Sequence, residues 1–290
     1  MRHYYKDKII KLFLQWTASL SIVIVICIFV FIFKEAIPFA KHPGLGELFG
    51  TRWVPTSPQK ESFGLVPLVT GSVVVTVLAM LLTIPFGVGA AVYISELAVP
   101  VEREILKPFI EVLAGIPSVV IGFFGLMVLV PFVKSCFGLA TGLTAFAGAV
   151  LLALMAIPTV TSISEDALRS VPRSYKEASL ALGASRIRTI WRVTVPAALP
   201  GIMAAVMLGT GRVIGETMAV MMVTGNSAMI TFWPFDSVRT MTATIAAEMG
   251  EVAFGSDHYR ALFCVGVVLL LATFGLNVAA QKVLSRYRMG

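Results

Sequence analysis

The chain has 290 residues, of which 57% are hydrophobic and only 13% are charged, and its formal net charge is +7. Soluble domains average about 45–50% apolar and about 25% charged residues. This composition therefore excludes an ordinary soluble enzyme, a disordered chain and a disulfide-stapled secreted domain, and a multi-pass membrane protein remains. The excess of basic residues is better explained by the positive-inside rule than by a nucleic-acid partner, which we do not expect.

Six apolar runs are each long enough to cross a bilayer as a helix, which takes about 20 residues. They cover residues 12–33, 66–94, 112–133, 135–164, 193–223 and 261–281. The first run follows several lysines but is too long for the apolar core of a signal peptide, so we interpret it as a retained anchor. The sequence therefore predicts an all-α polytopic membrane protein with six transmembrane helices.

Lysine and arginine residues set the expected orientation, because they accumulate on the cytoplasmic side of a membrane. With the N-terminus inside, fifteen of the 23 lysines and arginines fall in inner segments and seven in outer segments. We therefore expect both termini in the cytoplasm. The two long outer loops, 34–64 and 224–259, contain Trp53, Phe232 and Trp233. We interpret these aromatic residues first as anchors at the membrane surface, and alternatively as a docking surface for an external partner.

The inner segment 165–193 is polar and basic, yet it has the pattern of short helices. Ser174 and Glu177 fit a capping box, in which side chains satisfy backbone amides at a helix start. Gly183 can supply the left-handed residue that ends such a helix. An apolar stripe between these signals consists of Tyr175, Ala178 and Leu182. A solvated surface helix is one interpretation, and a helix that inserts into a groove on a partner is the other.

This segment resembles the EAA signature, E-A-A-x3-G-x9-I-x-L-P, of the permease subunits of bacterial ABC importers. Glu177-Ala178-Ser179 is followed by Gly183 and then by V-T-V-P at 193–196, with the spacing intact. The departures are conservative: serine for alanine, and valines for isoleucine and leucine. The resemblance implies the MetI-like fold of type I ABC importer permeases. It also implies contact with an ATP-binding subunit through Tyr175, Glu177, Ala178, Leu182 and Gly183.

The chain contains no G-x-x-x-x-G-K-[S/T] segment, the loop that holds nucleotide phosphates in P-loop ATPases. We therefore expect that it is not an enzyme by itself. ATP and Mg²⁺ would be bound by separate ATPase subunits, and we expect no cofactor or metal on this chain.

Arg212 and Glu216 are charged residues inside the fifth apolar run. A charge at the bilayer centre costs about 2.5–3.5 kcal/mol, so their presence indicates a benefit. They are spaced i, i+4 in the predicted fifth span, so we expect them to share a helix face. One interpretation is a self-neutralising structural pair, and the other is a cationic point on the path of an anion, with Glu216 holding the arginine. Arginine suits phosphate-like oxyanions, because its planar fork presents several donors.

The stretch R-V-I-G-E-T-M-A-V at 212–220 is similar to a segment of the PstC-type permeases of phosphate importers. Residues 111–120 and 241–251 also resemble that family, and the resemblance extends over most of residues 52–277. It implies a subunit that moves inorganic phosphate from periplasm to cytoplasm across the bacterial inner membrane. It further implies a PstA-like permease as heterodimer partner, two PstB-like ATP-binding subunits and a periplasmic phosphate-binding protein.

Candidate pathway residues and a domain division follow from these patterns. The pathway candidates are Arg212, Glu216, Thr217, Thr210 and Ser118. The hydroxyls are included because they can donate to phosphate, although packing is the commoner role of any one of them. We divide the chain into an anchor helix with its outer loop at 1–63 and a permease domain at 64–285, with the coupling loop at 165–193.

Several alternatives stay open. Within the transporter class, the chain could be a permease for sulfate or molybdate, or the PstA-type partner subunit. An intramembrane enzyme would need paired catalytic groups, but the six runs hold no histidine or aspartate, and their one carboxylate is Glu216. A channel or secondary transporter would leave the EAA-like loop without a role.

Overall fold

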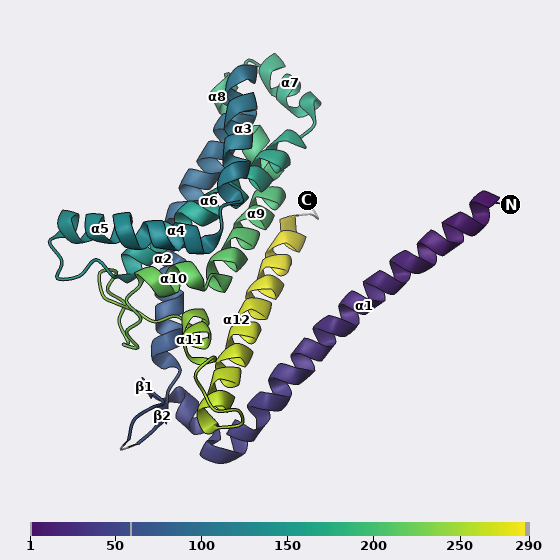
Figure 1. Cartoon of the computed structure of the whole chain (residues 1–290). Helices are drawn as coiled ribbons and strands as arrows, with labels where there is room; N and C mark the ends of the chain where they lie inside the picture. Colours follow the sequence, from purple (N-terminus) through teal and green to yellow (C-terminus); the bar gives the residue numbers. More distant parts are fainter. Residues whose placement is uncertain (1, 59, 288–290) are drawn as a thin grey trace.

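In a computed structural model, which describes residues 2–58 and 60–287, the chain is a bundle of helices with one short hairpin (Figure 1). The helices are α1 (Arg2–Phe39), α2 (Val66–Val92), α3 (Pro100–Ala114), α4 (Ser118–Phe124), α5 (Val130–Phe137), α6 (Ala145–Arg169), α7 (Arg173–Ala181), α8 (Arg186–Thr189), α9 (Val195–Gly215), α10 (Met218–Val223), α11 (Met241–Glu248) and α12 (Asp257–Tyr287). Shorter helical segments are η1 (Ala40–Gly44), η2 (Leu45–Phe49), η3 (Tyr93–Leu97), η4 (Gly125–Leu129) and η5 (Ile190–Thr194), and the strands are β1 (Trp53–Val54) and β2 (Ser62–Phe63).

Within the described residues, six helical segments are long and apolar enough to span a membrane, which confirms the predicted number. They are Ile10–Phe39, Val66–Leu97, Ser118–Phe137, Ala145–Arg169, Arg186–Gly215 and Asp257–Lys282. Most limits differ from those expected, and three of the differences make a segment shorter than its apolar run. The third segment begins at 118 rather than 112, the fourth begins at 145 rather than 135, and the fifth ends at 215 rather than 223.

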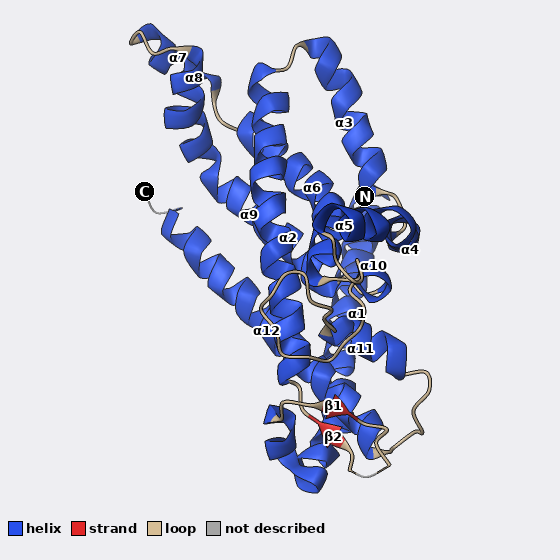
Figure 2. Cartoon of the chain, turned by 90° about the vertical axis from the view of Figure 1, so that its left-hand side faces the viewer, coloured by secondary structure: helices blue, strands red, loops and turns tan. Residues whose placement is uncertain are grey.

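The third segment is shorter because the chain breaks at Gly115-Ile116-Pro117, where α3 ends and α4 begins. Pro117 adopts an extended conformation with ψ 137°, and proline has no amide proton for a helical hydrogen bond. Figures 1 and 2 agree that α4, η4 and α5 run across the long helices instead of along them. The preceding helix, α3, is amphipathic and charged, and its last three residues, 112–114, belong to the third apolar run of the sequence.

The centre of the bundle is α6, which lies between α2 and α9 and is the most buried of the six segments. Small residues allow these helices to approach closely. A Cβ atom added to Gly209 of α9 would lie 2.5 Å from Cγ2 of Val160, and one added to Gly201 would lie 2.4 Å from Cβ of Ala167. Glycines on α9 therefore fix its position against α6.

Helix α1 diverges from the rest of the bundle, and Figure 1 shows that the C-terminal end of α1 meets the start of α12. There Phe31 makes an edge-on contact with Phe263, and Phe39 makes one with Phe63 of β2. No residue in the most apolar part of α1 is buried within the described chain. The fold thus has a compact α2–α6–α9 centre and an outlying first helix.

At the end of the bundle opposite α7 and α8, the hairpin pairs Trp53 with Phe63 (Figure 2). The prediction that Trp53 is a membrane-surface anchor is wrong, because its ring is buried and its Nε1 donates to Glu248 at 3.1 Å. Glu248 also accepts from Arg239 at 2.6 Å and pairs with His258 at 2.9 Å, so one carboxylate connects four segments. Phe232 and Trp233, in contrast, are exposed.

Candidate anion pathway and coupling surface

Helix α9 ends at Gly215, directly before Glu216. Glu216 is extended, with φ −70° and ψ 134°, and its Oε1 accepts from the backbone amide of Ala219 at 3.3 Å, near the start of α10. The prediction that Arg212 and Glu216 share one helix face is therefore wrong, since the helix on which that spacing depends has already ended. No ion pair joins their side chains among the described contacts. Glu216 instead accepts from an amide in the first turn of α10, a position that favours negative charge.

Arg212, in the last turn of α9, connects three helices. Its Nη1 donates to Oγ1 of Thr159 on α6 at 3.1 Å, and its Nη2 donates to the carbonyl oxygen of Ala114 at 3.4 Å. Ala114 is the last residue of α3, where helix carbonyls lack intrahelical partners and carry partial negative charge. Because a guanidinium has five N–H donors, Arg212 retains donors for a further acceptor. The side chain is half-buried, which leaves it accessible to an ion.

Sequence reasoning missed both partners of Arg212. Thr159 follows Pro158 inside an otherwise apolar stretch, and a hydroxyl in that setting is a weak signal. The Ala114 carbonyl could have been suspected from Gly115-Ile116-Pro117, because a break at proline leaves the preceding carbonyls without helical partners. What the sequence could not show is that this break lies beside the end of α9.

The structure places two of the three candidate hydroxyls near these helix breaks. Thr217 lies in the α9–α10 break, where its Oγ1 donates to the carbonyl of Gly215 at 3.2 Å. Ser118 is the first residue of α4, four positions after Ala114. Thr217 therefore follows the helix end that carries Arg212, and Ser118 follows the helix end that carries Ala114.

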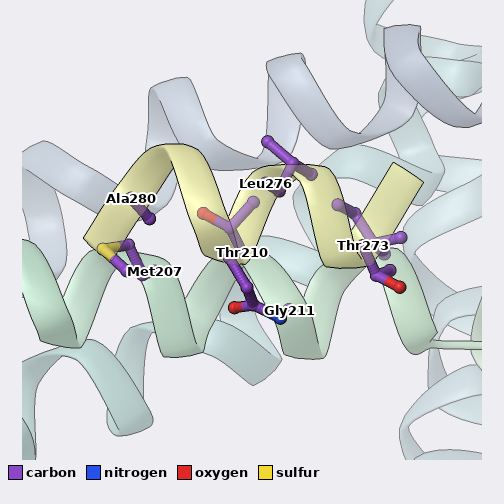
Figure 3. A pocket seen from close by; sticks show the side chains of 8 residues that line it. Met207, Thr210, Gly211, Thr273, Leu276 and Ala280 are labelled. Atoms are coloured by element: carbon purple, nitrogen blue, oxygen red, sulfur yellow. The ribbon is translucent and has the colours of Figure 1, made fainter. Parts of the chain in front are cut away.

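Thr210 lies elsewhere. It lines a cavity of about 90 Å³ between α9 and α12, together with Met207, Gly211 and Thr273 (Figure 3). Its hydroxyl donates to the carbonyl of Val206 at 2.8 Å. Two positions along a helix correspond to a rotation of about 200°, so Thr210 and Arg212 face opposite sides of α9. The structure does not bring Thr210 to the arginine.

At the other end of the fold, the predicted coupling helix exists as α7, but it begins differently. The helix starts directly after Pro172, so Ser174 lies inside it and the predicted capping box does not form. Proline at this position needs no amide partner and predisposes the chain to helix. Gly183 has φ +81°, as predicted for the residue that ends the helix.

The apolar stripe of α7 faces away from the bundle. Tyr175 and Ala178 are exposed, and the side chain of Leu182 is 90% exposed. Glu177 is exposed on the same short helix. A serine–threonine hydrogen bond of 2.9 Å, between Ser179 and Thr189, holds α7 against α8. The predicted coupling residues are thus all exposed, on α7 and in the turn that follows it.

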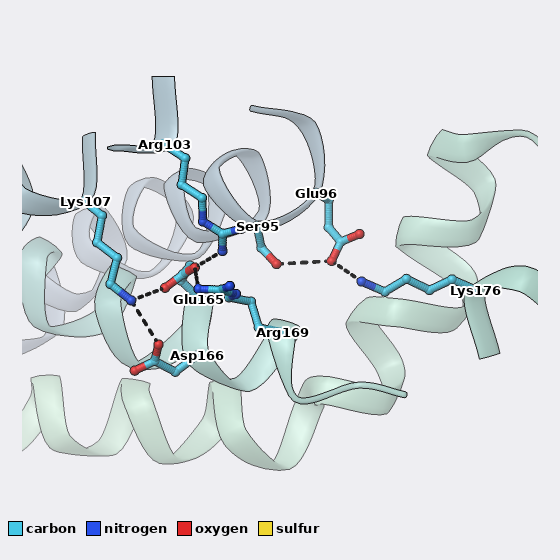
Figure 4. A network of polar contacts seen from close by, with 8 residues as sticks. All are labelled: Ser95, Glu96, Arg103, Lys107, Glu165, Asp166, Arg169 and Lys176. Atoms are coloured by element: carbon cyan, nitrogen blue, oxygen red, sulfur yellow. Dashed lines mark hydrogen bonds and ion pairs between the residues drawn. The ribbon is translucent and has the colours of Figure 1, made fainter. Parts of the chain in front are cut away.

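Two carboxylates anchor this end of the bundle (Figure 4). Glu96 of η3 accepts from Lys176 of α7 at 2.6 Å, and its backbone carbonyl accepts from Arg186 of α8; we call these contacts the Glu96 bridge. Glu165 of α6 accepts from Arg103 and from Lys107 of α3, the latter at 2.9 Å; we call these contacts the Glu165 cluster.

The Glu165 cluster is buried at its centre, because the Glu165 side chain is only 2% exposed. The hydrogen bond that Lys107 donates to Glu165 raises the pKa of this lysine, which therefore stays charged at any physiological pH. In the described part of the chain, no group of three His, Cys, Asp or Glu residues could hold a metal ion. The charged clusters are therefore connections between helices.

Comparisons with known proteins agree with this geometry. The profile of the family described as "Binding-protein-dependent transport system inner membrane component" matches residues 83–288. A Bacillus subtilis protein named "Probable ABC transporter permease protein YqgH" is 44% identical over 83% of this chain and 78% of its own. The Mesorhizobium japonicum "Phosphate transport system permease protein PstC" is 35% identical over 84% of this chain and 79% of its own.

Among solved structures, a chain of a bacterial alginate ABC transporter in complex with an alginate-bound periplasmic protein has a TM-score of 0.65. It is 15% identical, and the match covers 94% of each chain. A chain of the inward-facing MetNI methionine ABC transporter has a TM-score of 0.58 at 19% identity, covering 77% of this chain and 94% of its own. These similarities show the fold expected for a type I ABC importer permease.

Proposed function

Because the chain belongs to the family of binding-protein-dependent transport system inner membrane components, we propose that it is the PstC-type membrane permease subunit of an ATP-driven phosphate importer. The observation that carries this proposal is its 35% identity to a PstC permease over most of both chains. It is a multi-pass membrane protein, and ATP is hydrolysed on a different subunit.

In the proposed mechanism, Arg212 contacts phosphate on its way through the membrane. The arginine lies in the last turn of α9, and the end of α3 places the Ala114 carbonyl beside it. Its guanidinium can exchange the Ala114 carbonyl, held at 3.4 Å, for a phosphate oxygen, because a charged acceptor makes a stronger hydrogen bond. A site with competing protein acceptors binds the ion weakly, which transport requires, since a tightly held ion leaves slowly.

The exposed stripe of α7 supplies the proposed contact with the ATPase. Tyr175, Ala178 and Leu182 are apolar side chains on a short helix, a form that inserts into grooves on partner proteins. The ATPase subunits, of the PstB-like kind, would hold ATP and Mg²⁺. The end with α7 and α8 would face the cytoplasm, and we propose the same side for both termini.

The remaining partners follow from the same proposal. A PstA-like permease would complete the pathway as the second membrane subunit, and a periplasmic phosphate-binding protein would deliver the ion to the end with β1 and β2. An ABC transporter with this fold has been solved together with a periplasmic binding protein. The alternative cargoes are sulfate and molybdate.

Reconstitution tests the cargo directly. The chain, co-expressed with its PstA-like and PstB-like partners, is placed in liposomes that contain ATP, and the binding protein is added outside with labelled phosphate or sulfate. We expect ATP-dependent uptake of phosphate and no uptake of sulfate. Uptake of sulfate or molybdate in place of phosphate would overturn the proposed cargo, and purification without any ATP-binding subunit would overturn the ABC assignment.

A further inference from the structure

Helix α3 is attached at three points that together connect the coupling helices to Arg212. Its first turn follows η3, which carries the Glu96 bridge; its middle carries Arg103 and Lys107 of the Glu165 cluster; and its last residue accepts from Arg212. A 15-residue helix is about 22 Å long. Contacts at both ends and in the middle allow it to move as one body.

The first attachment joins α3 to α7 and α8 (Figure 4). The Glu96 side chain is 9% exposed and accepts from Lys176 at 2.6 Å and from Ser95 at 3.1 Å. The Glu96 backbone carbonyl accepts from Arg186. A nearly buried carboxylate that loses its cation keeps the cost of its burial, so a displacement of α7 draws η3 with it.

Glu102 makes the connection from η3 to α3 stiff. It accepts from the hydroxyl of Tyr93, in η3, at 3.0 Å and from the backbone amide of Val99, in the η3–α3 turn, at 3.2 Å. The turn is only two residues long, from Ala98 to Val99. Motion of η3 is thus passed to α3 without a flexible linker between them.

The second attachment sets the position of α3 on α6. Arg103 and Lys107 are spaced i, i+4 and reach the same carboxylate, Glu165. The helix that carries Glu165 also carries Thr159, the other acceptor of Arg212. Arg212 therefore bridges the two helices that the Glu165 cluster holds together, and sliding α3 along α6 changes the distance between the Ala114 carbonyl and the guanidinium.

We propose that Glu96 and Glu165 are positioning residues through which α3 transmits movement of the coupling helices to the Arg212 site. When α7 moves with the ATPase, α3 follows through the Glu96 bridge, and its terminal carbonyl approaches or leaves the guanidinium. The arginine then offers fewer or more donors to the transported anion. This inference rests on the proposed function, and it adds residues outside the EAA-like loop to the coupling mechanism.

The test uses the full complex in liposomes and measures anion uptake and ATP hydrolysis in the same preparation. For Glu96→Gln and for Lys176→Met, we expect assembly and ATP hydrolysis to persist while uptake per ATP falls at least about fivefold, the lower end of ordinary coupling between sites. The double variant is expected to be no worse than the more affected single variant, since both remove the same contact. Lys176→Arg, which keeps the contact, is expected to retain the wild-type ratio.

The Glu165 cluster is tested in the same way with Glu165→Gln and, because a buried substitution can prevent folding, with the half-exposed Lys107→Met. The matched control is Asp257→Asn, which breaks an exposed ion pair with Arg260 at the opposite end of the bundle. We expect a lowered ratio for the two cluster variants and a wild-type ratio for the control.

Two results would overturn the inference: a wild-type ratio of uptake to ATP hydrolysis in Glu96→Gln, or losses that add in the double variant. Failure of the proposed cargo is a separate outcome, because the wild-type complex would then import no phosphate. In that case the ratio of uptake to ATP hydrolysis is measured with the anion that the wild type carries, and this measurement tests the inference about Glu96 independently of the cargo.

Discussion

Removal of the Arg212 guanidinium is the sharpest test of the proposed pathway. A hydrogen bond from a charged donor contributes about 1.5–3 kcal/mol, and about 1.4 kcal/mol corresponds to a tenfold change in rate. We count one such bond to the transported ion, the one in which a phosphate oxygen replaces the Ala114 carbonyl. Arg212→Ala is therefore expected to reduce phosphate uptake by about 10- to 150-fold.

The assay is initial uptake of labelled phosphate in liposomes, over a range of concentrations of the loaded binding protein. Assembly is checked by co-purification of the ATPase, which we expect to be unchanged since α7 lies at the far end of α9. Arg212→Lys keeps the charge but loses the planar fork, so its uptake is expected to lie between the wild type and the alanine variant.

Thr159→Val is the control that separates contact with the ion from support of the fold. It removes a neutral acceptor at 3.1 Å from Arg212 and leaves the cation in place. This hydrogen bond orients the arginine and does not contact the ion, so uptake should fall less than in Arg212→Ala. Uptake of Arg212→Ala within twofold of the wild type would refute the reasoning. Equal losses in Arg212→Ala and Thr159→Val would show that the arginine acts by holding helices together.

Three further predictions concern the coupling surface and the bundle centre. Gly183→Ala should destabilise the end of α7 by about 1–2 kcal/mol, because alanine is strained at φ +81°. Less ATPase should therefore co-purify with this variant. Gly250→Ala is the control and should have no effect, because Gly250 lies in open space with an ordinary φ. Leu182→Asp should leave the thermal unfolding temperature of the isolated permease unchanged, because that side chain is exposed, but should abolish co-purification of the ATPase; wild-type recovery of the ATPase would contradict the proposed docking stripe. Gly209→Ala should cost about 1–3 kcal/mol of stability, measured as a lower unfolding temperature in detergent, because its Cβ would meet Val160 at 2.5 Å; an unchanged temperature would show that α9 can move away from α6.

The number of spanning segments and the coupling helix could be predicted from sequence because their signals are local. A run of uncharged apolar residues indicates a span whatever lies beside it, and Gly183 marks a helix end by itself. The domain boundary at 63/64 and the termini in the cytoplasm stay predictions.

The pairing of Arg212 with Glu216 failed because it depended on a helix continuing through Gly215, and i, i+4 spacing carries no information about where a helix stops. The interruption before Pro117 is visible in the sequence, yet its consequence is not, since the direction taken by α4 depends on packing against α10. The basic partners of Glu96 and Glu165 on other helices are 58 to 90 residues away along the chain. Contacts at such separations follow from the tertiary fold and have no local signature.

The contrast between α1 and α6 has a consequence for the order in which the protein forms. An apolar helix in lipid satisfies its backbone internally, so α1, which precedes the other five spanning segments and is unburied along its apolar length, can be inserted in the bilayer before those segments are synthesised. Helix α6 cannot reach its final surroundings so early. Helix α9, whose glycines Gly201 and Gly209 pack against α6, begins only at Val195. Until α9 is inserted, one face of α6 must be covered by lipid or by the membrane-insertion machinery.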